Sequence, residues 1–277
     1  MPSNIRTGKY VVLLAFWLSC LTAWALQSQL IPDKQLEAAL RRVLPEVKGD
    51  ITESHLANVH ILEAKNSKIA KLTGLEKCRN LSLLNLENNQ IENLAPLAGL
   101  SKLQSLNVAH NRLRDLGPLA KLVQLQYLDA SGNQISDLTP LSHVSALSAL
   151  YLANNQIRDL KPLAHLSKLV SLDISKNQIS DISPLAKLTR LNTLNASDNQ
   201  ISDLSPVAGL PELRLLIVER NRITDLSALL EASRRDAAGP RHFVPFLRVY
   251  LAGNPLGPQA KQQIAELRKL GVRVESE

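Results

Sequence analysis

A repeat of 22 residues is the feature that most constrains how this chain can fold. Residues 131–141 read SGNQISDLTPL, residues 175–185 read SKNQISDISPL, and residues 197–207 read SDNQISDLSPV. One asparagine in each copy returns every 22 residues with no slippage. These asparagines are Asn89, Asn111, Asn133, Asn155, Asn177, Asn199 and Asn221. Because every copy keeps the same apolar skeleton, the repetition indicates architecture and argues against a single catalytic motif.

The spacing of the apolar residues predicts the kind of architecture. A period of 20–29 residues with the pattern L-x-x-L-x-L-x-x-N-x-L is typical of a leucine-rich repeat solenoid. The L-x-L alternation predicts a short strand with two inward side chains, and prolines at Pro96, Pro118, Pro140, Pro162, Pro184 and Pro206 suit short 3₁₀ turns on the return limb. We therefore expect an α/β solenoid: a right-handed superhelix of about nine repeats with a parallel concave sheet, a convex side of 3₁₀ or other turns, and helical caps at both ends.

The recurring asparagines are expected to form a structural ladder inside the stack. Asn254 continues the set after a longer interval. Each amide can bond backbone groups that the turn leaves unpaired and that water cannot reach. Leaving such a group without a partner costs roughly 1–3 kcal/mol.

The first residues have a different composition. Arg6 and Lys9 precede the apolar run VVLLAFWLSCLTAWA, which ends in an A-x-A arrangement at Ala25. This pattern predicts a secretory signal peptide over residues 1–25; the alternatives are an uncleaved anchor and a lipid anchor on Cys20. Cleavage lowers the formal net charge from +7 to +5 and leaves Cys78 as the only cysteine, which we expect to be a buried, unreactive thiol. The predicted location is the periplasm or the outside of the cell.

The predicted organisation of the remaining chain is a cap, an array and a second cap. Residues 26–58 form an N-terminal helical cap, with Asp33 as N-cap and Leu36, Leu40 and Val43–Leu44 on one helical face. Residues 59–256 hold the repeats, and residues 257–277 form a C-terminal helical cap. The interval from Asn221 to Asn254 is 33 residues, so 11 residues are inserted within 227–246, where a helix is expected up to Gly239. The insertion is either part of a binding face or a tolerated surface feature.

Three stretches resemble known proteins. IPDKQLEAAL, GDITESHLANV and KLTGLEKCRNL resemble the N-terminal cap of bacterial secreted leucine-rich repeat proteins, including internalin-like ones. The 22-residue repeat is similar to that of the nuclear phosphatase-1 regulator, and LAGNPLGPQAKQQIAELRKLGVRV resembles the closing helix of bacterial repeat proteins. The resemblance implies a curved, protein-binding scaffold without catalysis. No immunoglobulin-like domain or sorting signal follows the repeats here, which weakens the case for host-cell adhesion.

Two clusters of outward strand residues are candidate binding sites on the concave face. Most outward positions are small or polar, as an exposed sheet face requires. The first cluster joins two aromatic rings to two carboxylates, and the second is apolar and adjoins the insertion. Their residues are Tyr127, Asp129, Tyr151 and Asp173, and Leu215, Ile217 and Tyr250. Ordinary strand propensity for aromatic and branched residues is the alternative explanation for both.

Other functional classes find little support. The sequence contains no phosphate-binding loop, nucleophile elbow or zinc pattern, so we expect no enzyme activity, no cofactor and no metal. His143 and His165 are expected to be solvated side chains on the outer limb. The basic residues are not gathered on the concave face, which argues against a nucleic-acid ligand. The leading hypothesis is a monomeric exported scaffold with a protein partner; the alternatives are an envelope protein held to anionic surface polymers and an intracellular phosphatase regulator.

Overall fold

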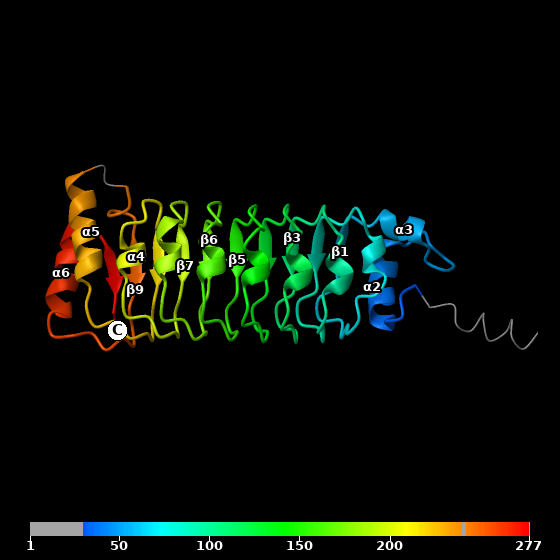
Figure 1. The fold of residues 1–277 in the computed structure, drawn as a ribbon, viewed down its shortest axis with the longest axis horizontal. Helices are drawn as coiled ribbons and strands as arrows, with labels where there is room; N and C mark the ends of the chain where they lie inside the picture. Colours follow the sequence, from blue (N-terminus) through cyan, green and yellow to red (C-terminus); the bar gives the residue numbers. More distant parts are fainter. Residues whose placement is uncertain (1–29, 240–241, 277) are drawn as a thin grey trace, which may run out of the picture.

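The computed structural model describes residues 30–239 and 242–276, and their dominant feature is one parallel sheet of ten strands in sequence order. The predicted signal peptide with Cys20, residues 26–29 of the predicted N-terminal cap and residues 240–241 of the insertion lie outside the described residues. The strands run side by side along the length of the molecule (Figure 1). Their bounds are β1 Ile61–Glu63, β2 Leu83–Asn85, β3 Ser105–Asn107, β4 Tyr127–Asp129, β5 Ala149–Tyr151, β6 Ser171–Asp173, β7 Thr193–Asn195, β8 Leu215–Ile217, β9 Arg248–Tyr250 and β10 Arg273–Glu275. The expected leucine-rich repeat solenoid is confirmed.

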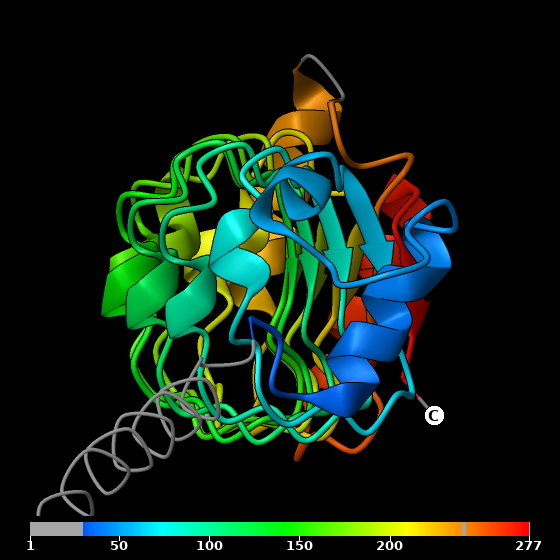
Figure 2. The ribbon, with the colours of Figure 1, turned by 90° about the vertical axis from the view of Figure 1, so that its right-hand side faces the viewer.

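The return limbs form short helical turns on the side of the array opposite the sheet (Figure 2). They are η1 Leu75–Lys77, η2 Ala95–Leu97, η3 Gly117–Leu119, η4 Thr139–Leu141, η5 Lys161–Leu163, η6 Ser183–Lys187 and the short α-helix α4 Ser205–Ala208. From η2 onward, proline occupies the first or second helical position, as fixed φ favours. The predicted 3₁₀ character is confirmed for all these limbs except α4.

A second recurring residue, which the sequence analysis overlooked, precedes each turn from η2 to α4 and also the helix at Ser227–Ala238. Its side chain accepts the backbone N–H two residues later, at 2.6–3.1 Å. The residues are Asn93, Asp115, Asp137, Asp159, Asp181, Asp203 and Asp225. The signal was present in the sequence, because Asn and Asp commonly bond the backbone two residues on to form such turns.

The apolar positions of all repeats merge into one continuous core. In the repeat around Asn133, for example, Leu125, Leu128, Ala130 and Ile135 are each 0 % exposed. A repeat alone could not bury these side chains, and stacking supplies the missing neighbours on both sides. Burial of a leucine or isoleucine side chain contributes roughly 1.5–3 kcal/mol, so the stack as a whole is stabilised chiefly by this core.

The asparagine ladder bridges each repeat to the one before it. The amide of Asn155 donates to Ala130 O at 3.0 Å in the preceding repeat and to Leu152 O at 3.1 Å in its own. Its carbonyl oxygen accepts from Ile135 N at 2.9 Å. The same set of bonds recurs from Asn89 to Asn221 and again at Asn254.

The residue that precedes each ladder asparagine has left-handed backbone geometry, which the sequence analysis did not predict. From Asn66, whose next residue Ser67 stands in the asparagine position, φ lies between 50° and 73° at every repeat. These residues are Asn66, Asn88, His110, Gly132, Asn154, Lys176, Asp198, Arg220 and Gly253. Asn, Asp and Gly tolerate this conformation best, so their frequency in this column was the available signal.

Two helices cover the N-terminal end of the array. Helix α2 (Lys34–Val43) packs against β1, and α3 (Glu53–Ala57) packs against η1 (Figure 1). Asp33 is confirmed as N-cap of α2: one carboxylate oxygen accepts from Gln35 N and Leu36 N, and the other accepts from Ala70 N and Lys71 N of the first repeat. The predicted apolar face was wrong at Val43, which is 40 % exposed because the helix ends there.

The C-terminal end is closed by two helices and an additional strand. The insertion forms α5 (Ser227–Ala238), which starts where a return limb is due and packs against α4 and α6 (Ala260–Leu270) rather than against β8 (Figure 1). Helix α5 therefore lengthens a return limb and does not pack on the strand that holds Leu215 and Ile217. The sequence analysis foresaw the closing helix but not β10, which pairs with β9 through Arg273↔Arg248 and Glu275↔Tyr250.

Candidate protein-binding surface

The outward side chains of the strands form two columns along the sheet. The register pairs Tyr127 with Ala149 and Asp129 with Tyr151, and then Tyr151 with Asp173. Tyr127 and Tyr151 are therefore diagonal neighbours on β4 and β5, as expected. All four side chains of this group are half-buried. We call Tyr127, Asp129, Tyr151 and Asp173 the Tyr–Asp patch.

The two tyrosine rings of the patch touch each other. Their centroids lie 5.6 Å apart, and the ring planes are tilted by 47°. Tilted aromatic pairs at this separation are favourable beyond the area that they bury. The pairing limits the freedom of both rings before any partner arrives, so less rotational entropy is lost when a partner binds.

The carboxylates of the patch differ in how fully they are hydrogen-bonded. Asp173 accepts from Ser175 N at 2.9 Å, from Ser175 Oγ at 2.7 Å and from Asn195 Nδ2 at 3.0 Å. Asp129 accepts only from Ser131 N, at 3.0 Å through Oδ1, within the described residues. Asp129 therefore keeps one carboxylate oxygen, Oδ2, available to a ligand.

The electrostatic environment of the patch is negative. Burial raises the pKa of Tyr127 above its usual value, and the nearby charges of Asp129 and Glu87 raise it further. Because an anion at Tyr127 would face these carboxylates, the phenol stays protonated and keeps its O–H as a donor.

The apolar candidates lie further along the same columns, on β8 and β9. Leu215 and Ile217 pair in register with Arg248 and Tyr250. Leu215, Ile217 and Tyr250 are half-buried, whereas Arg248 is exposed. The Arg214 guanidinium lies 5.0 Å from the ring centre of Phe246, which is 58 % exposed. The sequence analysis missed Phe246, since it lies in the insertion and belongs to no repeating column.

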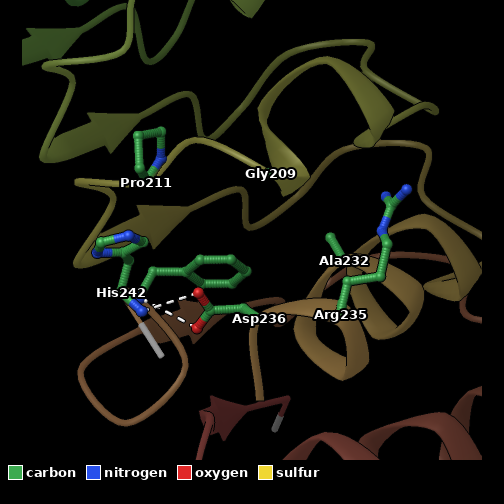
Figure 3. Close-up of a pocket in the computed structure, with 7 residues that line it drawn as sticks. Gly209, Pro211, Ala232, Arg235, Asp236 and His242 are labelled. Carbon is green, nitrogen blue, oxygen red and sulfur yellow. Dashed lines mark hydrogen bonds between the residues drawn. The ribbon is translucent and has the colours of Figure 1, made fainter. Parts of the chain in front are cut away.

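A hollow of about 310 Å³ beside α5 is lined by Gly209, Pro211, Ala232, Arg235, Asp236, His242 and Phe243. Figure 3 shows the Asp236 carboxylate pointing from α5 toward the backbone of His242. Asp236 accepts three backbone N–H groups, from His242 at 2.8 Å, Phe243 at 3.2 Å and Val244 at 2.9 Å. The carboxylate is thus fully used in holding the segment after α5, and it has a structural role.

The groups that catalysis or metal binding would need are dispersed. In the part of the chain that the structure describes, no three His, Cys, Asp or Glu side chains are close enough together to hold a metal ion. His143 and His165 are exposed on the return limbs. Cys78 is 0 % exposed, and burial, with a smaller effect of Glu76, raises its pKa to about 12. A thiol of this kind is a core side chain, because the reactive form is the thiolate.

The comparisons with known proteins agree on one family, the leucine-rich repeat proteins. The family model "Leucine Rich repeats (2 copies)" matches residues 101–143, 145–187 and 189–231. Among solved structures, internalin C2 from Listeria monocytogenes is 38 % identical with a TM-score of 0.70, and the match covers 72 % of this chain and 88 % of that one. A second Listeria monocytogenes internalin, inlF, is 28 % identical with a TM-score of 0.57 and 90 % of each chain covered.

More distant structures share the fold alone. The plant peptide hormone receptor RGFR1, solved in complex with RGF2, is 22 % identical with a TM-score of 0.61, and the match covers 80 % of this chain and 37 % of that receptor. No curated relative matches this chain.

Proposed function

Because the chain belongs to the internalin-like leucine-rich repeat proteins, we propose that it is a non-catalytic scaffold that binds another protein on the concave face of its sheet, at the Tyr–Asp patch. Leucine-rich repeat proteins are generally protein-binding scaffolds. The repeats fix the position of every strand, and the outward side chains select the partner.

The Tyr127–Tyr151 contact is the observation that carries this proposal. The neighbouring outward residues on β3, β6 and β7 are Ser105, Asn107, Ser171, Thr193 and Asn195, which are small or polar. Two touching tyrosines in such columns offer a large, rigid contact area that the sheet itself does not need. Tyrosine serves well in binding surfaces because it presents much area with only two rotatable side-chain bonds.

The cluster of Leu215, Ile217 and Tyr250 is proposed as a second contact region for the same partner. A row of half-buried apolar side chains on an open sheet face is typical of an interaction surface. Its rim is basic, since Arg214 and Arg248 flank it. We expect it to extend the interface and to contribute less than the tyrosine pair, which lies nearer the middle of the sheet.

Export of the protein as a monomer is part of the proposal. The positively charged start, apolar run and A-x-A site of residues 1–25 support export. None of the helices in the described part of the chain is long and apolar enough to cross a lipid bilayer.

A second candidate function, attachment to an anionic polymer of the cell envelope, is favoured by one specific feature. The segments that lead into β3 to β7 are 98–104, 120–126, 142–148, 164–170 and 186–192, and we call them the upstream rim. They contain Lys102, Lys121, Lys168, Lys187, Arg190 and two histidines, and no Asp or Glu. If this rim carries the main activity, the full chain should bind an anionic polysaccharide such as heparin, and Lys121→Glu with Lys187→Glu should lower the salt concentration at elution.

The proposed function is tested by affinity capture from envelope and secreted extracts. The full chain and its Tyr127→Ala/Tyr151→Ala variant would be immobilised in parallel, after thermal unfolding shows that both are folded. We expect a protein that the parent retains at about 0.5 M salt, where exposed charge pairs are largely screened, and that the variant loses. Equal retention by both would place the binding site elsewhere.

A further inference from the structure

The Tyr–Asp patch lies in a negatively charged stretch of a basic protein. The chain has a formal net charge of +7. The residues that form the sheet face of β2 to β7 are 82–87, 104–109, 126–131, 148–153, 170–175 and 192–197. They contain three carboxylates, Glu87, Asp129 and Asp173, and no Lys, Arg or His. A partner approaching this face therefore meets a potential opposite in sign to that of the whole molecule.

The carboxylates and the rings are adjacent. Tyr151 lies in register between Asp129 on β4 and Asp173 on β6. Tyr127 lies on the same strand as Asp129, and its register partners on the next two strands are Ala149 and Ser171. These two side chains are too short to cover the rings from that side. Aromatic surface is thus open to a ligand beside a carboxylate that has an unused oxygen.

We propose that the Tyr–Asp patch recognises a cationic side chain, an arginine in preference to a lysine, on an extended segment of the partner protein; this rests on the proposed function. The guanidinium would stack on the tyrosine rings and donate to Asp129 Oδ2. Arginine suits the site because its group is planar, stacks on aromatic faces and donates from several N–H groups at fixed angles. Asp173, held by Ser175 and Asn195, supplies a fixed negative charge on the other side of Tyr151.

Charged residues at the opposite end of the sheet determine in which direction the bound segment runs. Along the column that starts with Tyr127, the outward residue becomes Leu215 on β8, Arg248 on β9 and Arg273 on β10, whereas the neighbouring column ends in Ile217, Tyr250 and Glu275. A second cation of the partner would be repelled over the column that holds the two arginines. The partner segment therefore places its basic residue over β4 to β6 and apolar or acidic residues over β8 to β10.

A displayed library of random peptides tests the inference. The library is selected on the full chain and counter-selected on the Tyr127→Ala/Tyr151→Ala variant, so that only peptides dependent on the patch survive. We expect these peptides to be enriched in arginine. Replacing that arginine by citrulline, which is neutral and of similar shape, should weaken binding roughly ten-fold or more, as expected for loss of a charge-assisted hydrogen bond.

A charge variant of the protein tests the same contact by removing the carboxylate instead of the cation. Asp129→Asn keeps the shape and both tyrosines, and it should lower the affinity of the arginine peptides about as much as citrulline does. Glu63→Gln, at an exposed carboxylate on β1 at the end of the same sheet away from β8 to β10, is the control and should change affinity less than about two-fold.

The possible outcomes distinguish a failure of the cationic inference from a failure of the proposed function. Peptides that depend on the tyrosines but show no enrichment in arginine or lysine would overturn the cationic inference and leave the binding function intact. Full affinity in Asp129→Asn would do the same. A selection that yields no peptide dependent on the tyrosine pair would contradict both.

Discussion

The regular array and the closing segment provide hydrogen-bond partners for buried backbone groups in different ways. In the array, between Asn89 and Asn221, each buried turn is satisfied by an asparagine at a fixed position. In the closing segment after Asp225, residues that occur once take over this role. Gln263 accepts from Leu226 N at 3.0 Å, Asp236 accepts three backbone N–H groups, and Arg268 donates to Val274 O at 2.6 Å.

This difference decides what each region reveals about function. In the array, a column of equivalent positions shows what the scaffold needs, so a residue that departs from its column requires another explanation. Tyr127 and Tyr151 are such departures. In the closing segment most residues outside β9 and the Asn254 turn have no equivalent in the other repeats, and a contact such as that between Phe246 and Arg214 serves packing and recognition equally well. The Tyr–Asp patch is therefore the strongest candidate for a binding site.

The largest effect is expected from breaking the ladder inside the array. Asn155→Ala leaves Ile135 N without a partner in a buried site and removes bonds to Ala130 O and Leu152 O. We expect the free energy of unfolding to fall by about 3 kcal/mol, measured as a lower midpoint in urea.

Asn254→Ala is the matched change at the end of the array. Asn254 is only half-buried, so water can replace part of what it contributes, and a loss of about 1 kcal/mol is expected. Equal losses of unfolding free energy at the two positions would show that burial does not determine how much a ladder asparagine contributes.

The next largest effect should come from Asp236→Ala in the closing segment. Phe243 and Val244 are buried, and their N–H groups would lose their acceptor. We expect a loss of about 2 kcal/mol, limited because the end of a solenoid can open without unfolding the rest. Hydrogen exchange should quicken in residues 227–250 and stay unchanged in residues 83–195. Faster exchange throughout would contradict this division into two regions.

Gly132→Ala tests the left-handed column of the array. Gly132 has φ +66°, and an added Cβ would come within 2.5 Å of His110 Nδ1. A non-glycine residue in this geometry costs roughly 1–2 kcal/mol. Gly99→Ala is the control, because a Cβ there meets nothing within 4 Å. In the double variant with His110→Ala the contact disappears, so part of the loss should be recovered; no recovery would mean that the backbone alone causes it.

The smallest effect concerns the acidic caps, a name we give to the turn residues Asp137, Asp181 and Asp225 together with Asp198, which accepts from the Arg220 guanidinium. The Thr139 side chain and backbone hold the pKa of Asp137 below its usual value, Ser183 does so for Asp181, Arg220 for Asp198 and Gln263 for Asp225. A carboxyl whose folded pKa is lowered contributes stability above its unfolded pKa, near 4, and loses it as the pH falls through the folded value.

We therefore expect the melting temperature to be constant from about pH 7 to pH 5 and to fall below about pH 4. Each single Asp→Asn change at the exposed residues Asp137, Asp181 and Asp225 should alter it only slightly. Asp181→Asn in the array should be milder than Asp225→Asn, which also loses the 2.6 Å bond from Gln263. A melting temperature independent of pH down to about pH 2 would rule out these caps as contributors.

The sequence predicted those parts of the fold that recur. The positions of strands β1 to β9, the 3₁₀ limbs, the stacked leucines and the Asp33 cap follow from local spacing, because a fixed period also fixes which residues pair between neighbouring strands. The diagonal placement of Tyr127 and Tyr151 followed from the same frame.

The parts that could not be predicted depend on contacts between residues far apart in the chain. The place of α5 against α4 and α6, the hold of Asp236 on Val244 and the approach of Phe246 to Arg214 involve no period. The β10 strand was within reach, since Val272, Arg273, Val274 and Glu275 alternate between apolar and charged residues.

Hydroxyl-radical footprinting of the full chain, with and without its captured partner, tests the central claim most directly. The described part of the chain has three tyrosines, Tyr127 and Tyr151 in the array and Tyr250 in the closing segment, so one oxidisable residue type reports on both regions. The account predicts that the partner strongly protects Tyr127 and Tyr151 from oxidation and protects Tyr250 less. Protection of Tyr250 with Tyr127 and Tyr151 unchanged would contradict it and would place the binding site beside the insertion.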